Sequence, residues 1–281
     1  MASRLIVSSC WAMCVVLGLA MVTPSYALLA EQQAEPQPIE VAAYEFPPYY
    51  SSNMEEHLLG ALLSQLNERQ QTYHFTITEV RVSQRYQAFD NGGCCELVFF
   101  ENPRWGWEEL LESKLKQGAL LTRGADLYMS LEDPLKTLQG EVTVGGVQGY
   151  HYNLTNYQQD SSTLEREHSL YLANNQMTLI HMLRRERLDV IIVSDEFVRY
   201  LEGQSSPVMA GLEYKTAIDQ EYGTYIFARQ DREDVLARVE EELAAMLEEG
   251  SLGHLFEQFG LAENLYFEPP QETAGDSAVA H

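Results

Sequence analysis

The fold is decided by the stretch Ile39-Glu40-Val41-Ala42-Ala43-Tyr44-Glu45-Phe46-Pro47-Pro48-Tyr49-Tyr50. Its first five residues predict an apolar strand, and the two prolines end that strand while holding the flanking aromatic side chains rigidly. In an α/β sheet, ligands bind beyond the carboxyl ends of the strands. Aromatic residues on a stiff loop at such an end indicate a wall for an organic ligand, with Glu45, Phe46 and Tyr49 as candidates. The alternative is an ordinary proline turn whose aromatic side chains fill the core.

Downstream, strands and helices alternate, which predicts an α/β fold. Asn53, with Glu56 three residues on, predicts the start of a helix whose leucines share one face. Further strands are predicted at 73–80, 96–100, 125–131, 141–147, 169–173, 189–193 and 222–228. Further helices are predicted at 84–89, after an Asn175 cap, at 235–247 and at 251–259. The fully apolar strand at 189–193 is of the kind that is buried on both faces of a parallel sheet.

Two more strand ends carry candidate ligand-binding residues. The loop after the strand at 96–100 contributes Glu101, Arg104, Trp105 and Trp107. The strand at 141–147 ends in Gly149, Tyr150 and His151. A strand, a glycine and a helix start would leave backbone N–H groups free for an anionic group. A plain strand-to-helix turn is the alternative there.

The first residues predict a secretory signal peptide over 1–27. Arg4 supplies the positive charge, 5–22 is apolar, and cleavage is expected after Ala27. An uncleaved membrane anchor is the alternative, because the apolar stretch is almost long enough to span a bilayer. The expected location is the periplasm, and no later stretch is long and apolar enough to cross a membrane.

The composition excludes one class of partner. The chain has 281 residues and a formal net charge of −24. Its length is enough for two lobes with cores of their own. Such an acidic surface repels the phosphates of nucleic acids, so no nucleic acid is expected as a partner. The charge says little about the ligand, since a site can differ in sign from the surface around it.

Only two cysteines, Cys94 and Cys95, lie outside the leader, and they are adjacent. A bridge across one trans peptide would hold their Cα atoms about 3.8 Å apart, below the usual disulfide range of roughly 4.4–6.8 Å. A disulfide ring and two buried thiols both remain open. A metal site needs more ligands at suitable spacing, so no metal and no cofactor are expected.

Four motifs in order give the chain a family resemblance. They are the Pro-Pro-Tyr loop, Leu-x-Gly-x-Val-x-Val-Gly (138–145), Asn-x-Met-x(5)-Leu-x(5)-Asp-Val (175–190) and Leu-x-Glu-Gly-Ser-Leu-x(6)-Phe-Gly (247–260). From about Ile39 to Leu261 the chain resembles solute-binding protein family 3, the periplasmic receptors of polar amino acid ABC transporters.

The resemblance implies a type II periplasmic-binding-protein fold of two α/β lobes joined by two crossover segments, with the ligand cleft between them. Lobe one would hold 39–126 and 222–261, lobe two 134–215, and 262–281 is predicted to be a disordered tail. Hinge closure on a ligand is the usual motion of such proteins. The implied function is to bind a small polar or aromatic, amino-acid-like ligand for ABC-type uptake or sensing, as a monomer beside an inner-membrane permease.

The chain departs from the family pattern in one respect. The family's carboxylate-binding arginine stands in a Ser/Thr-rich stretch, and here Arg104 is the nearby candidate. The family's amine-binding acid has a match in Asp195, for which a helix N-cap is the alternative.

Two other functions are weighed. An exported prephenate-type dehydratase on the same fold could use Glu45 or Glu101 as a general acid. No motif of a serine hydrolase, zinc protease, Walker loop or dinucleotide site is present. No catalytic residue is therefore assigned and the protein is not expected to be an enzyme. A sensor subunit without transport is the second alternative.

Overall fold

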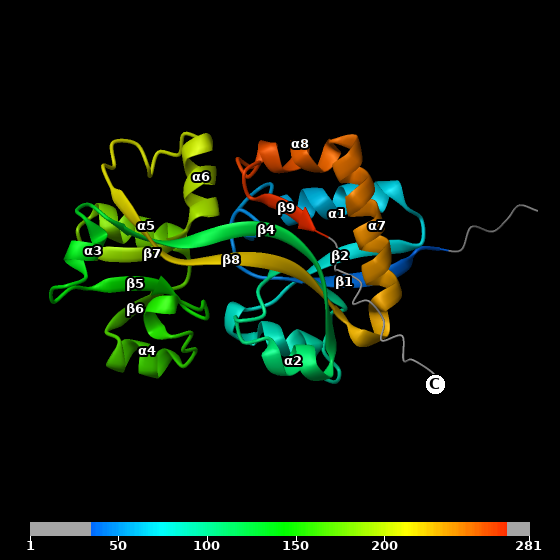
Figure 1. Ribbon diagram of the computed structural model, residues 1–281, viewed down its shortest axis with the longest axis horizontal. Coiled ribbons are helices and arrows are strands. Elements are labelled where there is room, and N and C mark those ends of the chain that lie inside the picture. Colours follow the sequence, from blue (N-terminus) through cyan, green and yellow to red (C-terminus); the bar gives the residue numbers. More distant parts are fainter. Residues whose placement is uncertain (1–34, 269–281) are drawn as a thin grey trace, which may run out of the picture. The chain divides into compact units, whose positions relative to one another are not determined.

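The computed structural model describes residues 35–268, whose strands form one mixed sheet (Figure 1). The strand order is β2-β1-β3-β8-β4-β7-β5-β6, with β9 paired to β4. The strands are β1 Gln37–Ala43, β2 Tyr73–Glu79, β3 Leu97–Glu101, β4 Leu115–Ser130, β5 Val144–Val147, β6 Leu170–Ala173, β7 Val190–Ser194, β8 Lys215–Arg229 and β9 Leu265–Glu268.

Helices cover this sheet. The α-helices are α1 Leu58–Arg69, α2 Glu108–Ser113, α3 Pro134–Thr137, α4 Ser161–Glu167, α5 Gln176–Arg184, α6 Asp195–Gly203, α7 Glu233–Glu249 and α8 Ser251–Gln258. Three 3-10 helices are η1 Val82–Phe89, η2 Asn153–Thr155 and η3 Gln230–Arg232. In residues 35–268, no helix is both long and apolar enough to span a bilayer.

Two long antiparallel strands connect the two halves of the sheet. β4 and β8 run side by side, paired from Leu115 opposite Arg229 to Ser130 opposite Lys215 (Figure 1). One group, β2-β1-β3, joins the sheet at β8, and the other, β7-β5-β6, joins it at β4. We call these groups with their helices the β1 side and the β7 side. β4 and β8 are the two crossovers, while the residue bounds of the lobes stay a prediction.

Each side has its own buried core. On the β1 side, the predicted leucine face of α1 is confirmed, and it packs with residues of β1, β3, α7 and α8. On the β7 side, alternate residues of β7 enter two separate clusters. Ile191 and Val193 pack with α5, whereas Val190 and Ile192 pack against the α4 face. Because side chains alternate along a strand, β7 is buried on both faces, as its apolar sequence predicts.

Of three predicted helix starts, one is confirmed and two are wrong. The predicted Asn53 cap is wrong: α1 begins at Leu58, and Nδ1 of His57 accepts the N–H of Gly60 at 2.9 Å. The Asn175 cap is confirmed, since its side chain accepts the N–H of Thr178 at 2.8 Å. The helix expected directly after Gly149 is wrong, because η2 intervenes and α4 begins only at residue 161.

The predicted tail is partly a strand. Disorder over 262–281 is wrong for β9, which pairs with β4. Asn264 supports this pairing, because its carbonyl accepts the N–H of Arg123 at 2.9 Å and its amide donates to the Arg123 carbonyl at 3.0 Å. The rest of the tail and the predicted signal peptide lie outside the described residues.

The adjacent cysteines form a disulfide. Cys94 and Cys95 are bonded to each other, with their Cα atoms 3.7 Å apart. The ring alternative therefore holds, and the alternative of two free thiols does not. The pair lies in the loop between η1 and β3.

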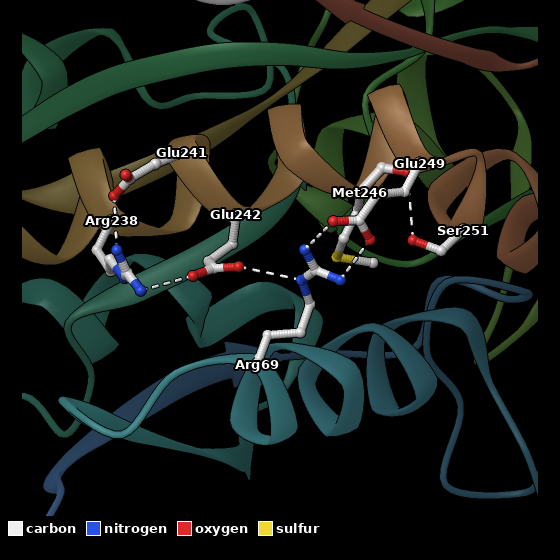
Figure 2. Close-up of polar contacts among 7 residues, drawn as sticks. All are labelled: Arg69, Arg238, Glu241, Glu242, Met246, Glu249 and Ser251. Atoms are coloured by element: carbon white, nitrogen blue, oxygen red, sulfur yellow. Dashed lines mark hydrogen bonds and ion pairs between the residues drawn. The ribbon is translucent and has the colours of Figure 1, made fainter.

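A network of charged side chains joins α1 to α7 (Figure 2). Arg69 on α1 reaches Glu242 at 3.0 Å and Glu249 at 2.7 Å. Arg238 on α7 then holds Glu242 at 2.7 Å from its other side, and Glu241 at 2.7 Å. Glu242 is thus shared by two arginines, and the network links α1 to α7.

Candidate ligand-binding site

A small cavity of about 20 Å³ lies where loops from both sides of the sheet meet the crossing strands. Its lining combines aromatic rings with three groups that can carry charge. The lining residues are Tyr44, Phe46, Arg85, Trp105, Asp126, Gly149, Tyr150, His151 and Tyr222. The β1 side supplies the first four, β4 and β8 supply Asp126 and Tyr222, and the loop after β5 supplies the rest.

Four rings make adjoining walls of this cavity. Phe46 meets Trp105 at 5.8 Å between ring centroids and 85°, and it meets Tyr150 at 5.7 Å and 89°. Trp105 meets Tyr222 at 5.0 Å and 72°. We call these four residues the aromatic walls. Their steep angles are the edge-to-face arrangement that neighbouring aromatic rings prefer.

Arg85 of η1 is a buried cation whose N–H groups are largely occupied. Its side chain is 2% exposed. One terminal nitrogen donates to the carbonyls of Val82 at 2.7 Å and Gly149 at 3.1 Å. The other donates to the carbonyl of Trp105 at 3.2 Å and lies 3.3 Å from Nδ1 of His151. Arg85 thereby ties η1 on the β1 side to the loop after β5.

Glu101 lies behind the cavity wall as the counter-charge of Arg85. Its Oε1 is 3.6 Å from Nε of Arg85, and its Oε2 accepts from Nε1 of Trp107 at 2.7 Å. Burial raises the pKa of Glu101 to about 7, while Arg85 and the Trp107 hydrogen bond oppose that rise. The carboxyl is therefore close to its midpoint at neutral pH.

Asp126 on β4 is the acid that lines the cavity itself. Nε2 of Gln220 donates to its Oδ2 at 2.7 Å and to the carbonyl of His151 at 2.6 Å. Burial, with smaller contributions from the charges of Asp219 and Asp195, raises the pKa of Asp126 to about 8, although the hydrogen bond from Gln220 lowers it. Burial, followed by the charge of Arg85, lowers the pKa of His151 to about 3, so that imidazole is neutral at physiological pH.

Five sequence-predicted residues come together in the cavity lining: Phe46, Trp105, Gly149, Tyr150 and His151. Gly149 takes part differently from the expectation, since it is its carbonyl that contacts Arg85. Its φ of +84° requires glycine, and an added Cβ would lie 2.9 Å from Cγ1 of Val82.

Three predicted residues, Tyr49, Glu101 and Trp107, lie buried behind the wall. Tyr49 stacks on Phe100 at 4.2 Å and its hydroxyl donates to Glu196 at 3.2 Å. Trp107 is fully buried and donates to Glu101. These side chains support the aromatic loops from beneath, which corresponds to the core-filling alternative raised for the proline loop.

Three others lie outside the cavity. The Arg104 guanidinium stacks on the ring of Tyr157 at 4.1 Å, and Glu45 lines neighbouring surface hollows. Asp195 accepts the N–H of Ala125 at 2.9 Å and lies 3.4 Å from Nε of Arg199. Arg104 and Asp195, the pair suggested by the family pattern, are thus separate from the cavity that Arg85 and Asp126 line.

Comparison with solved structures identifies the architecture. A Streptococcus pneumoniae ABC uptake transporter substrate-binding protein with bound histidine is 9% identical, with a TM-score of 0.59 over 79% of this chain and 92% of that one. The GluR0 ligand-binding core from Nostoc punctiforme, in complex with L-glutamate, is 14% identical, with a TM-score of 0.58 over 79% and 99%. The chain has the two-lobed fold of type II periplasmic binding proteins.

A third neighbour comes from a Streptococcus mutans study of glutathione import via GshT and the cystine ABC importer TcyBC. It is 12% identical, with a TM-score of 0.61 over 82% of this chain and 98% of that one. No protein-family model matches the sequence, and no curated protein sequence matches it significantly. The fold expected from the four motifs is confirmed.

Proposed function

We propose that this protein is an exported solute-binding protein that closes on a small, amino-acid-like organic ligand. The observation that carries the proposal is the cavity, enclosed by both sides of the fold and lined by aromatic walls with buried ionisable groups. Such a combination suits a small molecule that is largely desolvated and oriented by few polar groups. The neighbours with bound histidine and L-glutamate support the same ligand class.

Hydrogen bonds across the cavity support a closing motion. The hydroxyl of Tyr150 donates to the carbonyl of Glu45 at 2.8 Å, and Arg85 donates to the carbonyl of Gly149. Behind the cavity wall, the hydroxyl of Tyr49 on the β1 side also donates to Glu196 on α6 at 3.2 Å. A ligand can enter only when such contacts open, so binding and hinge motion are coupled.

The direct test is a thermal-shift screen of amino acids, amines and organic acids. Ligand at one hundred times Kd stabilises the folded state by about 2.7 kcal/mol, which corresponds to roughly 5–10 °C in a protein of this size. Trp105→Ala should abolish the shift, whereas Tyr266→Ala, which removes an exposed aromatic side chain on β9, should preserve it. If no compound in a broad screen raised the melting temperature, the binding function would be refuted.

We assign an inner-membrane ABC permease as the partner and the periplasm as the location. The TcyBC importer named with one structural neighbour supports this assignment. Deletion of the gene should reduce uptake of the ligand found in the screen. Undiminished uptake would contradict transport and favour the sensing alternative.

A further inference from the structure

The pairing of β1 with β3 places a carboxylate beside the two adjacent cysteines. The two strands are parallel neighbours. Just before their paired residues, the Glu40 carbonyl accepts the N–H of Glu96 at 2.9 Å, and the Glu40 N–H donates to the Glu96 carboxylate at 2.8 Å. Cys94 and Cys95 directly precede Glu96 in the chain. Both sulfurs and an oxygen of the Glu40 carboxylate therefore lie within 4.8 Å of one another.

The Glu40 carboxylate is held in place and is accessible to an ion. The hydroxyl of Thr78 on β2 donates to its Oε2 at 2.8 Å, and hydrogen bonds of this kind orient carboxylates that ligate metals. Among residues 35–268 this carboxylate has no basic partner within 4.0 Å, whereas Glu96 has Arg232 at 3.8 Å. Glu40 and Cys94 are exposed and Cys95 is buried. A cation can thus approach the three ligand atoms from solvent.

The bond between the cysteines contributes little to the stability of the fold. A disulfide stabilises a protein mainly by closing a loop in the unfolded chain, and the effect grows with loop length. A bond between Cys94 and Cys95 has no residue between its ends. Backbone hydrogen bonds hold this segment without it, because the Cys95 N–H donates to the Ala88 carbonyl at 3.1 Å and the Gly93 N–H to the Asp90 carbonyl at 2.8 Å. Reduction should therefore leave both thiols in place on a folded protein.

We propose that the reduced protein binds a zinc ion through Cys94, Cys95 and Glu40. Zinc takes thiolate sulfur at about 2.3 Å and carboxylate oxygen at about 2.0–2.2 Å in a tetrahedron, whose ligand atoms lie about 3.3–3.8 Å apart. The three atoms already lie within 4.8 Å, so only the two sulfurs have to separate, and water fills the fourth position. The site is distinct from the cavity, whose lining contains none of these residues. It does not depend on the proposed solute-binding function.

Binding requires a reductant, and the steps balance. A dithiol reductant transfers two electrons and two protons to the S–S bond, which breaks to give two thiols, and the reductant becomes a disulfide. The exposed side chain of Cys94 gives the attacking thiolate access. Zn²⁺ then binds both sulfurs as thiolates, and the two thiol protons pass to solvent. The oxidised protein offers only the carboxylate of Glu40, so zinc binding depends on reduction.

Thiol counting and zinc competition test the site. The full chain is reduced with dithiothreitol and freed of it by gel filtration under nitrogen, and a Cys94→Ser/Cys95→Ser double variant accounts for thiols elsewhere. The folded, reduced protein should show two more reactive thiols per chain than this variant. Competition with a chromogenic chelator should show one more zinc ion per chain than the double variant binds, about 100-fold or more tightly than by the oxidised protein.

A pair of matched variants tests the carboxylate. Glu40→Gln keeps the shape of the side chain and removes its charge, so it should weaken zinc binding by the reduced protein about tenfold or more. Glu79→Gln alters another exposed carboxylate. Glu79 follows Thr78 in β2 and so points to the opposite face of the sheet. Its replacement should change zinc affinity by less than about twofold, a difference well below that of a lost ligand.

Three results would overturn the inference. The first is equal zinc affinity in the reduced and oxidised protein, or in the reduced protein and the double variant. The second is an unchanged affinity in Glu40→Gln, because the cysteines alone would then hold the ion. The third is a disulfide that dithiothreitol opens only after urea unfolds the protein. None of these results bears on the solute-binding function, which the thermal-shift screen tests separately.

Discussion

Replacement of Glu101 by Gln should change how the stability of the protein depends on pH. Glu101 is completely buried, and burial raises its pKa from 4.5 to about 7. Between these values the folded protein retains a proton that the unfolded chain has released. The free energy of unfolding contributed by this group is therefore fully present below pH 4.5 and falls as the pH rises to about 7.

The size of the effect follows from the two pKa values. Each tenfold change in proton affinity corresponds to about 1.4 kcal/mol, so the full loss between pH 4.5 and 7 is about 3 kcal/mol. Gln has nearly the same shape, and its amide oxygen can still accept the hydrogen bond from Trp107. It lacks the titration, and it also leaves Arg85 without its counter-charge. Glu101 balances Arg85 only when it is ionised, so this cost is part of the same titration and the informative quantity is the change with pH.

Urea unfolding of both proteins from pH 4 to 9 measures this change. The difference in unfolding free energy, unaltered protein minus Glu101→Gln, should fall by about 3 kcal/mol between pH 4.5 and 7 and be level on either side. Glu108→Gln, which alters an exposed carboxylate on α2, should give a level difference throughout. A level or rising difference for Glu101→Gln would refute the reasoning from burial.

Two further predictions concern stability. Arg69→Gln should cost about 0.5–1 kcal/mol of unfolding free energy, and less at high salt, because the contacts of Arg69 to Glu242 and Glu249 on α7 are partly exposed. Urea unfolding at two salt concentrations tests this, and an equal loss at both would contradict it. Gly149→Val should lose about 1–3 kcal/mol along with ligand binding, because φ is positive and the new Cβ would meet Val82. An unchanged melting temperature for Gly149→Val would show that the loop adapts.

The aromatic part of the site was predictable because its signal is local. Phe46 and Trp105 each follow a strand, and strand ends can be recognised from apolar runs that stop at proline or glycine. The carboxyl ends of parallel strands meet at one edge of a sheet, so two such loops had to lie near each other. Local pattern could not say which rings face the ligand, and Tyr49 and Trp107 proved to be part of the core.

The charged part was missed because its signal is not local. Arg85 lies in a 3-10 turn, and its burial depends on stacking over Tyr44 at 5.0 Å and Tyr86 at 4.6 Å and on carbonyls distant in sequence. Asp126 was within a predicted strand. Its place in the cavity depends on the pairing of β4 with β8, which sets it opposite Gln220. One hint was available: an acid within the mostly apolar stretch 125–131.

The choice between Asp126 and Asp195 shows how neighbouring acids acquire different roles. β4 pairs with β7 so that Asp126 stands opposite Ser194, and Asp195 is the next residue. The two carboxyls are thus close enough for the charge of Asp195 to raise the pKa of Asp126. Asp195 already accepts a backbone N–H and lies 3.4 Å from Nε of Arg199, so its charge has a partner within the protein. Asp126 has only the neutral amide of Gln220, and its burial raises its pKa to about 8.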